Sequence, residues 1–179
     1  MELPAEILKK VLKQYSENTI YKNVIDEMIN RIKQTIDISE IEYISGGERR
    51  DWFFSNIIAY LLNKSHITLF KDLTSVVSNP DFSNTQEIND LNNAKVLHVA
   101  DLVTEASSYV RAWIPAVRKH NANIVWSYVV VDRMQGGSSV LDNLGIKPFS
   151  LIISISVYLA LVYVFSFASA TIFSSSSSE

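Results

Sequence analysis

The segment ADLVTEASS, residues 100–108, has the residue types of a phosphate-binding loop. It follows the apolar run VLHV and places three hydroxyl side chains, those of Thr104, Ser107 and Ser108, around the expected start of a helix. Backbone N–H groups at a helix N-terminus favour anions, and hydroxyl groups add further donors. The segment therefore predicts a phosphate site, with a plain helix cap after a core strand as the alternative.

Two further segments place polar residues and glycines after an apolar run. The segment SGGERRD, residues 45–51, contains Arg49 and Arg50. Guanidinium groups suit bidentate phosphate contacts, and the alternative is a solvated helix start paired with Asp51. The segment VDRMQGG, residues 131–137, ends in two glycines. Because ligands of open α/β sheets bind beyond the carboxyl ends of the strands, these loops are the places to expect a site.

Hydrophobic periodicity predicts the elements that position these loops. Helices are expected at 3–14, 21–36, 51–62, 106–119 and 138–144. Strands are expected at 41–44, 66–70, 96–99, 123–131 and 149–152. The run 123–131 is apolar on both faces, which is typical of a buried parallel strand.

This alternation of strands and helices predicts an α/β fold, an open parallel sheet flanked by helices, with an N-terminal helical pair. Residues 1–40 would form the helical pair, 41–150 the α/β core and 151–179 a separate uncharged tail. Ser45, Gly46 and Gly47 predict a tight turn after the first strand. Asp51 is a candidate cap for the helix that follows.

Composition excludes several classes of protein. The chain has 179 residues, 47% hydrophobic and 20% charged, which excludes a disordered chain and fits one domain. A net charge of −3 gives no electrostatic case for nucleic acid. The absence of cysteine excludes disulfides and thiolate chemistry, and the histidines share no zinc-ligand spacing. The N-terminus has no long apolar run, so no secretory signal is expected and a cytoplasmic location is favoured.

Two of these motifs together resemble a known family. VLHVADLVTEASS resembles the phosphoribosyl-diphosphate motif of type I phosphoribosyltransferases. VVVDRMQGGSSVLDNLGIKPFSL resembles the segment after the next strand in the orotate enzymes of that family. YISGGERRDWFFSNIIAYLL stands where the family has its diphosphate loop, and HITLFKD where it has the next strand. The resemblance covers residues 41–151 in the right order.

The resemblance implies a reaction and a fold. The fold would be that of the type I phosphoribosyltransferases. The reaction would transfer phosphoribose from 5-phosphoribosyl 1-diphosphate to an orotate-like pyrimidine, with Mg²⁺ bridging diphosphate and ribose oxygens, in pyrimidine nucleotide biosynthesis. Catalysis would rest on positioning and charge stabilisation. The family is commonly dimeric, so the resemblance implies a homodimer.

The resemblance also implies a role for each matching residue. Asp101 would bind the ribose hydroxyls and is the candidate metal ligand. Lys71, near the diphosphate, and Asp101 are the catalytic candidates, and Arg133 would contact the base. The remaining donor-binding candidates are Gly46, Gly47, Arg49, Arg50, Thr104, Ala106, Ser107 and Ser108.

Three departures from the family pattern support a second hypothesis. Ala100 stands where the first acid of a pair belongs, and Glu105 stands in the phosphate loop. Residues 73–94, expected to be a long loop with at most one short helix, hold no Lys, Arg or His, whereas the orotate enzymes carry a catalytic lysine there. The alternative function is a phosphoribosyltransferase-like protein that binds a nucleotide or phosphoribose as a sensor without turnover.

The tail differs in composition from the rest of the chain. Residues 148–178 contain no charged residue and no histidine. The stretch 151–173 is long enough to cross a hydrocarbon layer of about 30 Å as a helix. Three interpretations stay open: a membrane anchor, a truncated or frameshifted reading frame, and a packed strand with an oligomer contact.

Overall fold

The computed structural model describes residues 3–153 and begins with the two expected amphipathic helices. They are α1 (Leu3–Glu17) and α2 (Thr19–Thr35). The Asn18 side chain accepts a hydrogen bond from the N–H of Tyr21 at 3.0 Å, which caps α2. Both helices bury the apolar face predicted from their spacing, so the N-terminal helical pair is confirmed.

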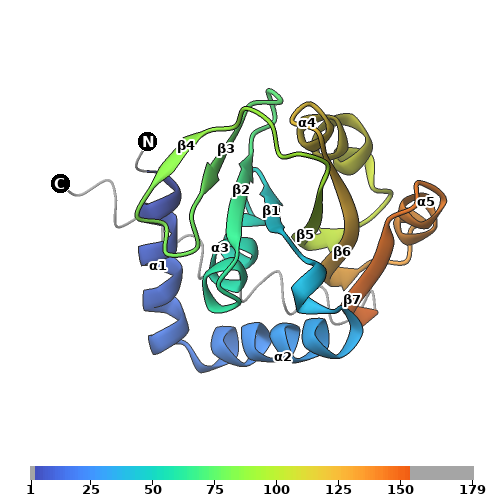
Figure 1. Ribbon diagram of the computed structural model, residues 1–179. Coiled ribbons are helices and arrows are strands. Elements are labelled where there is room, and N and C mark those ends of the chain that lie inside the picture. Colours follow the sequence, from blue (N-terminus) through green and yellow to red (C-terminus); the bar gives the residue numbers. More distant parts are fainter. Residues whose placement is uncertain (1–2, 154–179) are drawn as a thin grey trace.

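The sheet has seven strands in the order β4-β3-β2-β1-β5-β6-β7 (Figure 1). The strands are β1 (Tyr43–Gly47), β2 (Ser65–Leu69), β3 (Ser75–Ser78), β4 (Thr85–Glu87), β5 (Ala94–Val103), β6 (Ala122–Asp132) and β7 (Lys147–Ile153). The five strands β2, β1, β5, β6 and β7 are mutually parallel. Their carboxyl ends therefore meet at one edge, and the predicted open α/β sheet is confirmed.

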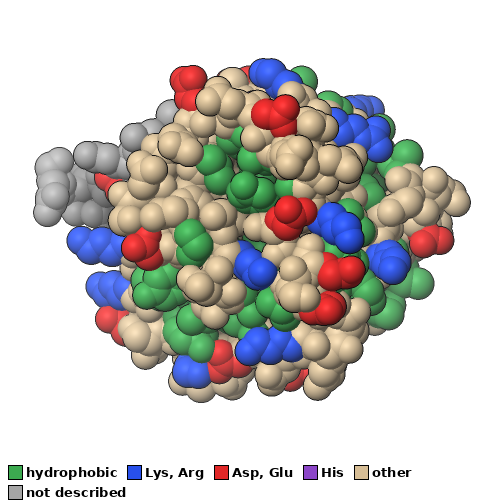
Figure 2. Space-filling view, viewed as in Figure 1, with side chains coloured by type: hydrophobic (Ala, Val, Ile, Leu, Met, Phe, Trp, Pro, Cys, Tyr) green, Lys and Arg blue, Asp and Glu red, His purple; other side chains and the backbone are tan. Residues whose placement is uncertain are grey.

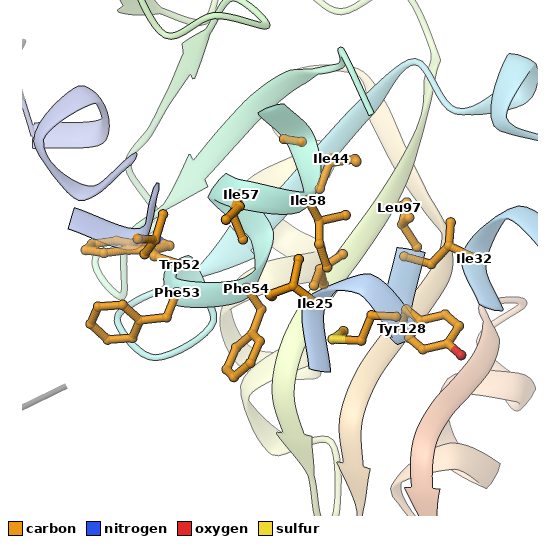
Figure 3. Packing of buried hydrophobic residues seen from close by; sticks show 14 of the residues in the cluster. Ile25, Ile32, Ile44, Trp52, Phe53, Phe54, Ile57, Ile58, Leu97 and Tyr128 are labelled. Carbon is orange, nitrogen blue, oxygen red and sulfur yellow. The ribbon is translucent and has the colours of Figure 1, made fainter. Parts of the chain in front are cut away.

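Helices cover both faces of the sheet. Besides α1 and α2 they are η1 (Ile38–Glu40), α3 (Trp52–Leu61), η2 (Tyr109–Trp113), α4 (Ile114–Arg118) and α5 (Gly137–Asn143). One apolar cluster joins α1, α2 and α3 to one face, and Figure 3 shows its centre. A second cluster joins η2, α4 and α5 to the other face. Val99 belongs to the first cluster and Ala100 to the second, as expected because successive strand residues point to opposite faces.

The segment after β2 differs from the prediction of a long loop. It forms an antiparallel hairpin, β3 and β4, which extends the sheet beyond β2. Two short turns shape it, in which Asp72 and Asp81 each accept a hydrogen bond from a backbone N–H two residues on. Phe82 anchors the hairpin because its side chain is buried against the His66 ring. The sequence did not indicate these strands because they have only four and three residues and lie in a polar segment.

The two glycines at the end of β1 are strand residues and not the turn that was predicted. A Cβ built on Gly46 would lie 2.0 Å from Ser55 Oγ, and one on Gly47 would lie 2.3 Å from the Trp113 ring. Glycine is therefore required here by close packing of β1 against α3 and η2. The turn itself comprises residues 48–51.

Replacing Gly47 tests this packing. We expect Gly47→Ala to lower the free energy of unfolding by about 1–3 kcal/mol, because the methyl group overlaps the buried Trp113 ring. Urea unfolding measures the loss. Gly145→Ala is the control for backbone strain alone, since Gly145 has a φ of +78° but no atom within 4 Å of its Cβ position. A loss no larger than that of the control would contradict the packing argument.

The surface carries no single-sign patch on the face shown in Figure 2, where basic and acidic side chains are interspersed. Within residues 3–153, no helix combines the length and the apolar character that crossing a membrane requires. The stretch 151–173 starts as the last three residues of β7 and otherwise lies outside the described residues. The predictions made for it therefore stay predictions.

Candidate functional site

A pocket of about 750 Å³ lies at the carboxyl ends of β1 and β5. The loop after β1 (48–51), Lys71 after β2, and residues 100–104 and 106–109 from β5 into η2 form its walls. Trp113 of η2 also lines it. This is the edge where ligands of open α/β sheets bind. The fold thus brings two of the three predicted loops to one pocket.

The wall formed by residues 104–108 has the form of an anion-binding turn. After β5 ends at Val103, Ala106 adopts a φ of +60° and a helical turn begins at Ser107. Ala106, together with Thr104, Ser107 and Ser108, lines the pocket. Backbone N–H groups at a helix N-terminus favour an anion, so this turn is a candidate anion site of the pocket. Glu105 is exposed and outside the pocket lining, so the acid in this loop does not face the ligand space.

The loop after β6 supports this turn from outside the pocket. The Arg133 N–H donates to the Val103 carbonyl at 3.0 Å, and the Gly137 N–H donates to the Thr104 carbonyl at 2.8 Å. Asp132, buried at the end of β6, accepts from the Met134 N–H at 2.8 Å and shapes the loop. Arg133, the predicted base contact, is half-buried and outside the pocket lining. The third loop therefore positions the turn at 104–108.

Gly137 is the residue of this support that tolerates no side chain. A Cβ at Gly137 would lie 2.4 Å from the Thr104 carbonyl oxygen. We expect Gly137→Ala to displace the turn and weaken binding of inorganic phosphate at least tenfold, which titration calorimetry measures. Gly136→Ala is the control, because Gly136 has a φ of +90° but open space at its Cβ position. Equal phosphate affinity in both variants would show that the contact with Thr104 does not shape the pocket.

Three basic side chains line the pocket: Arg49, Arg50 and Lys71. Glu48 joins their two loops, since its Oε2 accepts a hydrogen bond from the Lys71 N–H at 3.1 Å. The peptide bond between Glu48 and Arg49 is cis. The pocket therefore combines cationic side chains with the hydroxyl-rich turn, and both kinds of group favour an anionic ligand.

Two carboxylates, those of Asp51 and Asp101, also line the pocket. Asp51 Oδ1 accepts a hydrogen bond from the Asp101 N–H at 3.0 Å, and its Oδ2 accepts from the Gly47 N–H at 3.2 Å. Asp101 Oδ2 pairs with Arg50 Nε at 2.9 Å. Burial raises the pKa of Asp51 to about 6. Burial first, and then the neighbouring Asp51 charge, raise the pKa of Asp101 to about 7, and Arg50 opposes this shift.

Asp51 does not cap α3 as predicted. It has helical backbone angles and makes no side-chain capping bond, because its carboxylate points across to β5. The carboxylate also lies close to His98. His98 Nε2 is 3.6 Å from Asp51 Oδ2, and His98 Nδ1 contacts Ser45 Oγ at 2.9 Å. Burial lowers the pKa of His98 to about 3, so the contact with Asp51 is not an ion pair. His98 is a packed core histidine.

The pocket carboxylates are the candidate ligands for the predicted Mg²⁺. Within the described part of the chain, no group of three or more His, Asp or Glu side chains could hold a metal ion. Mg²⁺ commonly keeps several waters and binds through one or two carboxylates together with substrate phosphates. Asp101, with a side chain 20% exposed at the pocket, fits that mode of binding. A donor-bound Mg²⁺ is therefore compatible with the pocket, and a dedicated protein cage is not.

The predicted site residues divide into two groups. Those that line the pocket are Arg49, Arg50, Lys71, Asp101, Thr104, Ala106, Ser107 and Ser108. Gly46, Gly47 and Arg133 lie outside the lining and act on the site through packing or backbone hydrogen bonds. Sequence reasoning missed Glu48 and Asp51 as pocket residues. Their signal was their position on either side of Arg49 and Arg50, in the polar loop before a helix start.

Comparison with known proteins identifies the fold. No protein-family model and no curated protein sequence matches the chain. Among solved structures it is similar to orotate phosphoribosyltransferase from Aeropyrum pernix, with a TM-score of 0.60 and 17% identity over 82% of this chain and 78% of that one. It is similar to adenine phosphoribosyltransferase from Thermoanaerobacter pseudethanolicus, with a TM-score of 0.59 and 15% identity over 78% and 83% of the two chains.

A longer protein shows the same likeness. UMP synthase from Leishmania donovani matches with a TM-score of 0.59 and 17% identity, over 87% of this chain but only 32% of that one. The chain therefore has the fold of the type I phosphoribosyltransferases. Orotate and adenine enzymes match to the same degree, so the fold does not select a base.

Proposed function

We propose that this protein is a phosphoribosyltransferase that binds 5-phosphoribosyl 1-diphosphate in the pocket at the carboxyl ends of β1 and β5. The observation that carries the proposal is the set of chemistries that line one pocket. Hydroxyl side chains come from the turn at 104–108, carboxylates from Asp51 and Asp101, and cations from Arg49, Arg50 and Lys71. Such a set suits the groups of the donor, which has a phosphate, a ribose and a diphosphate.

Each wall takes one part of the donor. The turn at Ser107 and Ser108 holds the 5-phosphate, Asp101 accepts hydrogen bonds from the ribose hydroxyls, and the diphosphate contacts Arg49, Arg50 and Lys71. Binding of the diphosphate draws Arg50 from its pair with Asp101, which frees that carboxylate for the sugar. Mg²⁺ bound with the donor would offset the charge of the leaving diphosphate.

An orotate-like pyrimidine is the proposed acceptor. The support is the resemblance of residues 129–151 to the orotate enzymes, and the position of Arg133 at the end of β6, beside the phosphate turn. We also propose a homodimer, by resemblance to the same family. The acceptor is the part of the proposal that a substrate panel decides.

A second candidate function is a sensor that binds the donor or a nucleotide without turnover. One observation favours it: the hairpin β3–β4 and its flanks, residues 73–93, contain no Lys, Arg or His. This segment therefore cannot bring a cation over the departing diphosphate, and Lys71 and the two arginines supply the cationic side chains of the pocket.

An assay with purified protein separates the two functions. The protein is incubated with the donor, Mg²⁺ and either orotate or adenine, and diphosphate release is followed together with the absorbance of the base. A transferase releases diphosphate in step with consumption of one base. Donor binding without release in either reaction would leave the sensor function, and the absence of donor binding would overturn both the transferase and the donor sensor.

A further inference from the structure

Position 100 of β5 lines the pocket without contributing a polar group. Ala100 is buried, and its methyl group lies on the face of β5 that packs against η2. His98, two residues earlier, points to the same face, where its ring packs against Tyr109 at 4.8 Å between centroids. A side chain longer than alanine at position 100 would extend over His98 toward the pocket.

Asp51 places a carboxylate in that same region from the loop after β1. β1 pairs with β5 only as far as Ser45 opposite His98. Beyond that point the Asp51 side chain, and not the β1 backbone, bonds to β5. It accepts a hydrogen bond from the Asp101 N–H at 3.0 Å and lies 3.6 Å from His98 Nε2. Its two oxygens are thus held between residues 98 and 101, across Ala100.

Backbone hydrogen bonds hold the Asp51 carboxylate in place, and the same side chain lines the pocket. The Gly47 and Asp101 N–H groups hold one oxygen each. The buried His98 Nε2 has no hydrogen-bond partner and faces the carboxylate. The Asp51 side chain is 11% exposed and lines the pocket beside the Asp101 carboxylate, which is 20% exposed. A carboxylate still has lone pairs for a hydroxyl donor after accepting one bond at each oxygen.

We propose that Asp51 is a binding residue for the sugar, and that Asp51 and Asp101 together accept hydrogen bonds from neighbouring hydroxyls of a pentose phosphate. This inference rests on the proposed function, and adds a residue from the loop after β1 to the sugar site. It also explains how a pocket with alanine at position 100 retains two carboxylates.

The test uses ribose 5-phosphate and inorganic phosphate as probes in titration calorimetry with the full chain. We expect Asp51→Ala to weaken ribose 5-phosphate binding at least tenfold and to leave phosphate affinity within about threefold. We expect the double variant Asp51→Ala with Ala100→Asp to recover most of the lost affinity, because it returns a carboxylate to the same space from β5. Ala100→Asp alone crowds two carboxylates and is expected to bind ribose 5-phosphate more weakly than the natural chain.

The outcomes separate the two levels of the argument. If the natural chain binds neither probe, the proposed function fails and the inference fails with it. If it binds both, but Asp51→Ala retains its ribose 5-phosphate affinity, the inference alone is wrong. An equal loss for both probes without recovery in the double variant assigns Asp51 to fold support and also overturns the inference. Asp51→Asn, which keeps the shape of the side chain, repeats the test if the alanine variant does not fold.

Discussion

Asp101→Asn is expected to weaken binding of 5-phosphoribosyl 1-diphosphate by about 10- to 100-fold, because a hydrogen bond to a charged acceptor contributes about 1.5–3 kcal/mol. The sign of this result is informative. Removing a negative charge from a pocket that binds a polyanion would tighten binding if long-range repulsion decided the affinity. Weaker binding therefore shows direct contact of Asp101 with the sugar or with the donor-bound Mg²⁺. Titration calorimetry in the presence of Mg²⁺ measures the change.

Glu105→Gln is the matched control for charge. Glu105 lies in the adjacent turn but is exposed and outside the pocket lining. Its neutralisation is expected to leave donor affinity unchanged or slightly tighter, within about threefold, because exposed charges are screened by solvent and salt. Tighter binding in both variants would contradict the assignment of Asp101 to the ribose.

His66→Gln is expected to change how stability depends on pH. His66 is buried on β2, with Nε2 at 2.8 Å from Ser55 Oγ and Nδ1 at 3.1 Å from Thr68 Oγ1. Burial, and to a lesser extent His98, lower the pKa of His66 from 6.5 to about 3. The unfolded chain therefore binds more protons than the folded chain between these values, so this contribution to stability is present above pH 6.5 and is lost as the pH falls toward 3.

The expected loss of unfolding free energy follows from the lowered pKa of His66, because one pKa unit corresponds to about 1.36 kcal/mol. Between pH 7.5 and 4.5 the natural chain should lose about 2–3 kcal/mol of unfolding free energy relative to His66→Gln, since the glutamine does not titrate. Urea unfolding at both pH values measures the difference. His120→Gln is the control, because His120 is only half-buried at the surface and bonds to Ser75 Oγ at 2.7 Å. Parallel pH profiles for the natural chain and His66→Gln would show that His66 is not held neutral by burial.

The long apolar runs made most of the fold predictable. The runs 96–99 and 123–131 are predominantly apolar, and they correspond to the interior parallel strands β5 and β6. The hairpin β3–β4 was missed because its strands have four and three residues and lie among Ser, Asn and Asp. Only the tertiary contacts of that segment, such as the burial of Phe82, stabilise it as sheet.

The candidate site was predictable where local sequence determines geometry. The turn at 104–108 follows from a strand, hydroxyl side chains and a helix start, all adjacent in sequence. The role of Asp51 was not predictable, because its partners Asp101 and His98 are about fifty residues away and only the β1–β5 pairing brings them together. Gly46 and Gly47 were assigned to ligand contact because the sequence does not show the approach of Ser55 and Trp113.

A crystal structure of the protein with 5-phosphoribosyl 1-diphosphate and Mg²⁺ tests the central claim most directly, since it locates every group of the donor at once. The result expected is the 5-phosphate against the backbone of Ser107 and Ser108, with the sugar hydroxyls within hydrogen-bond distance of Asp101. A donor bound with its 5-phosphate away from that turn, or bound outside the pocket at the carboxyl ends of β1 and β5, would contradict the account.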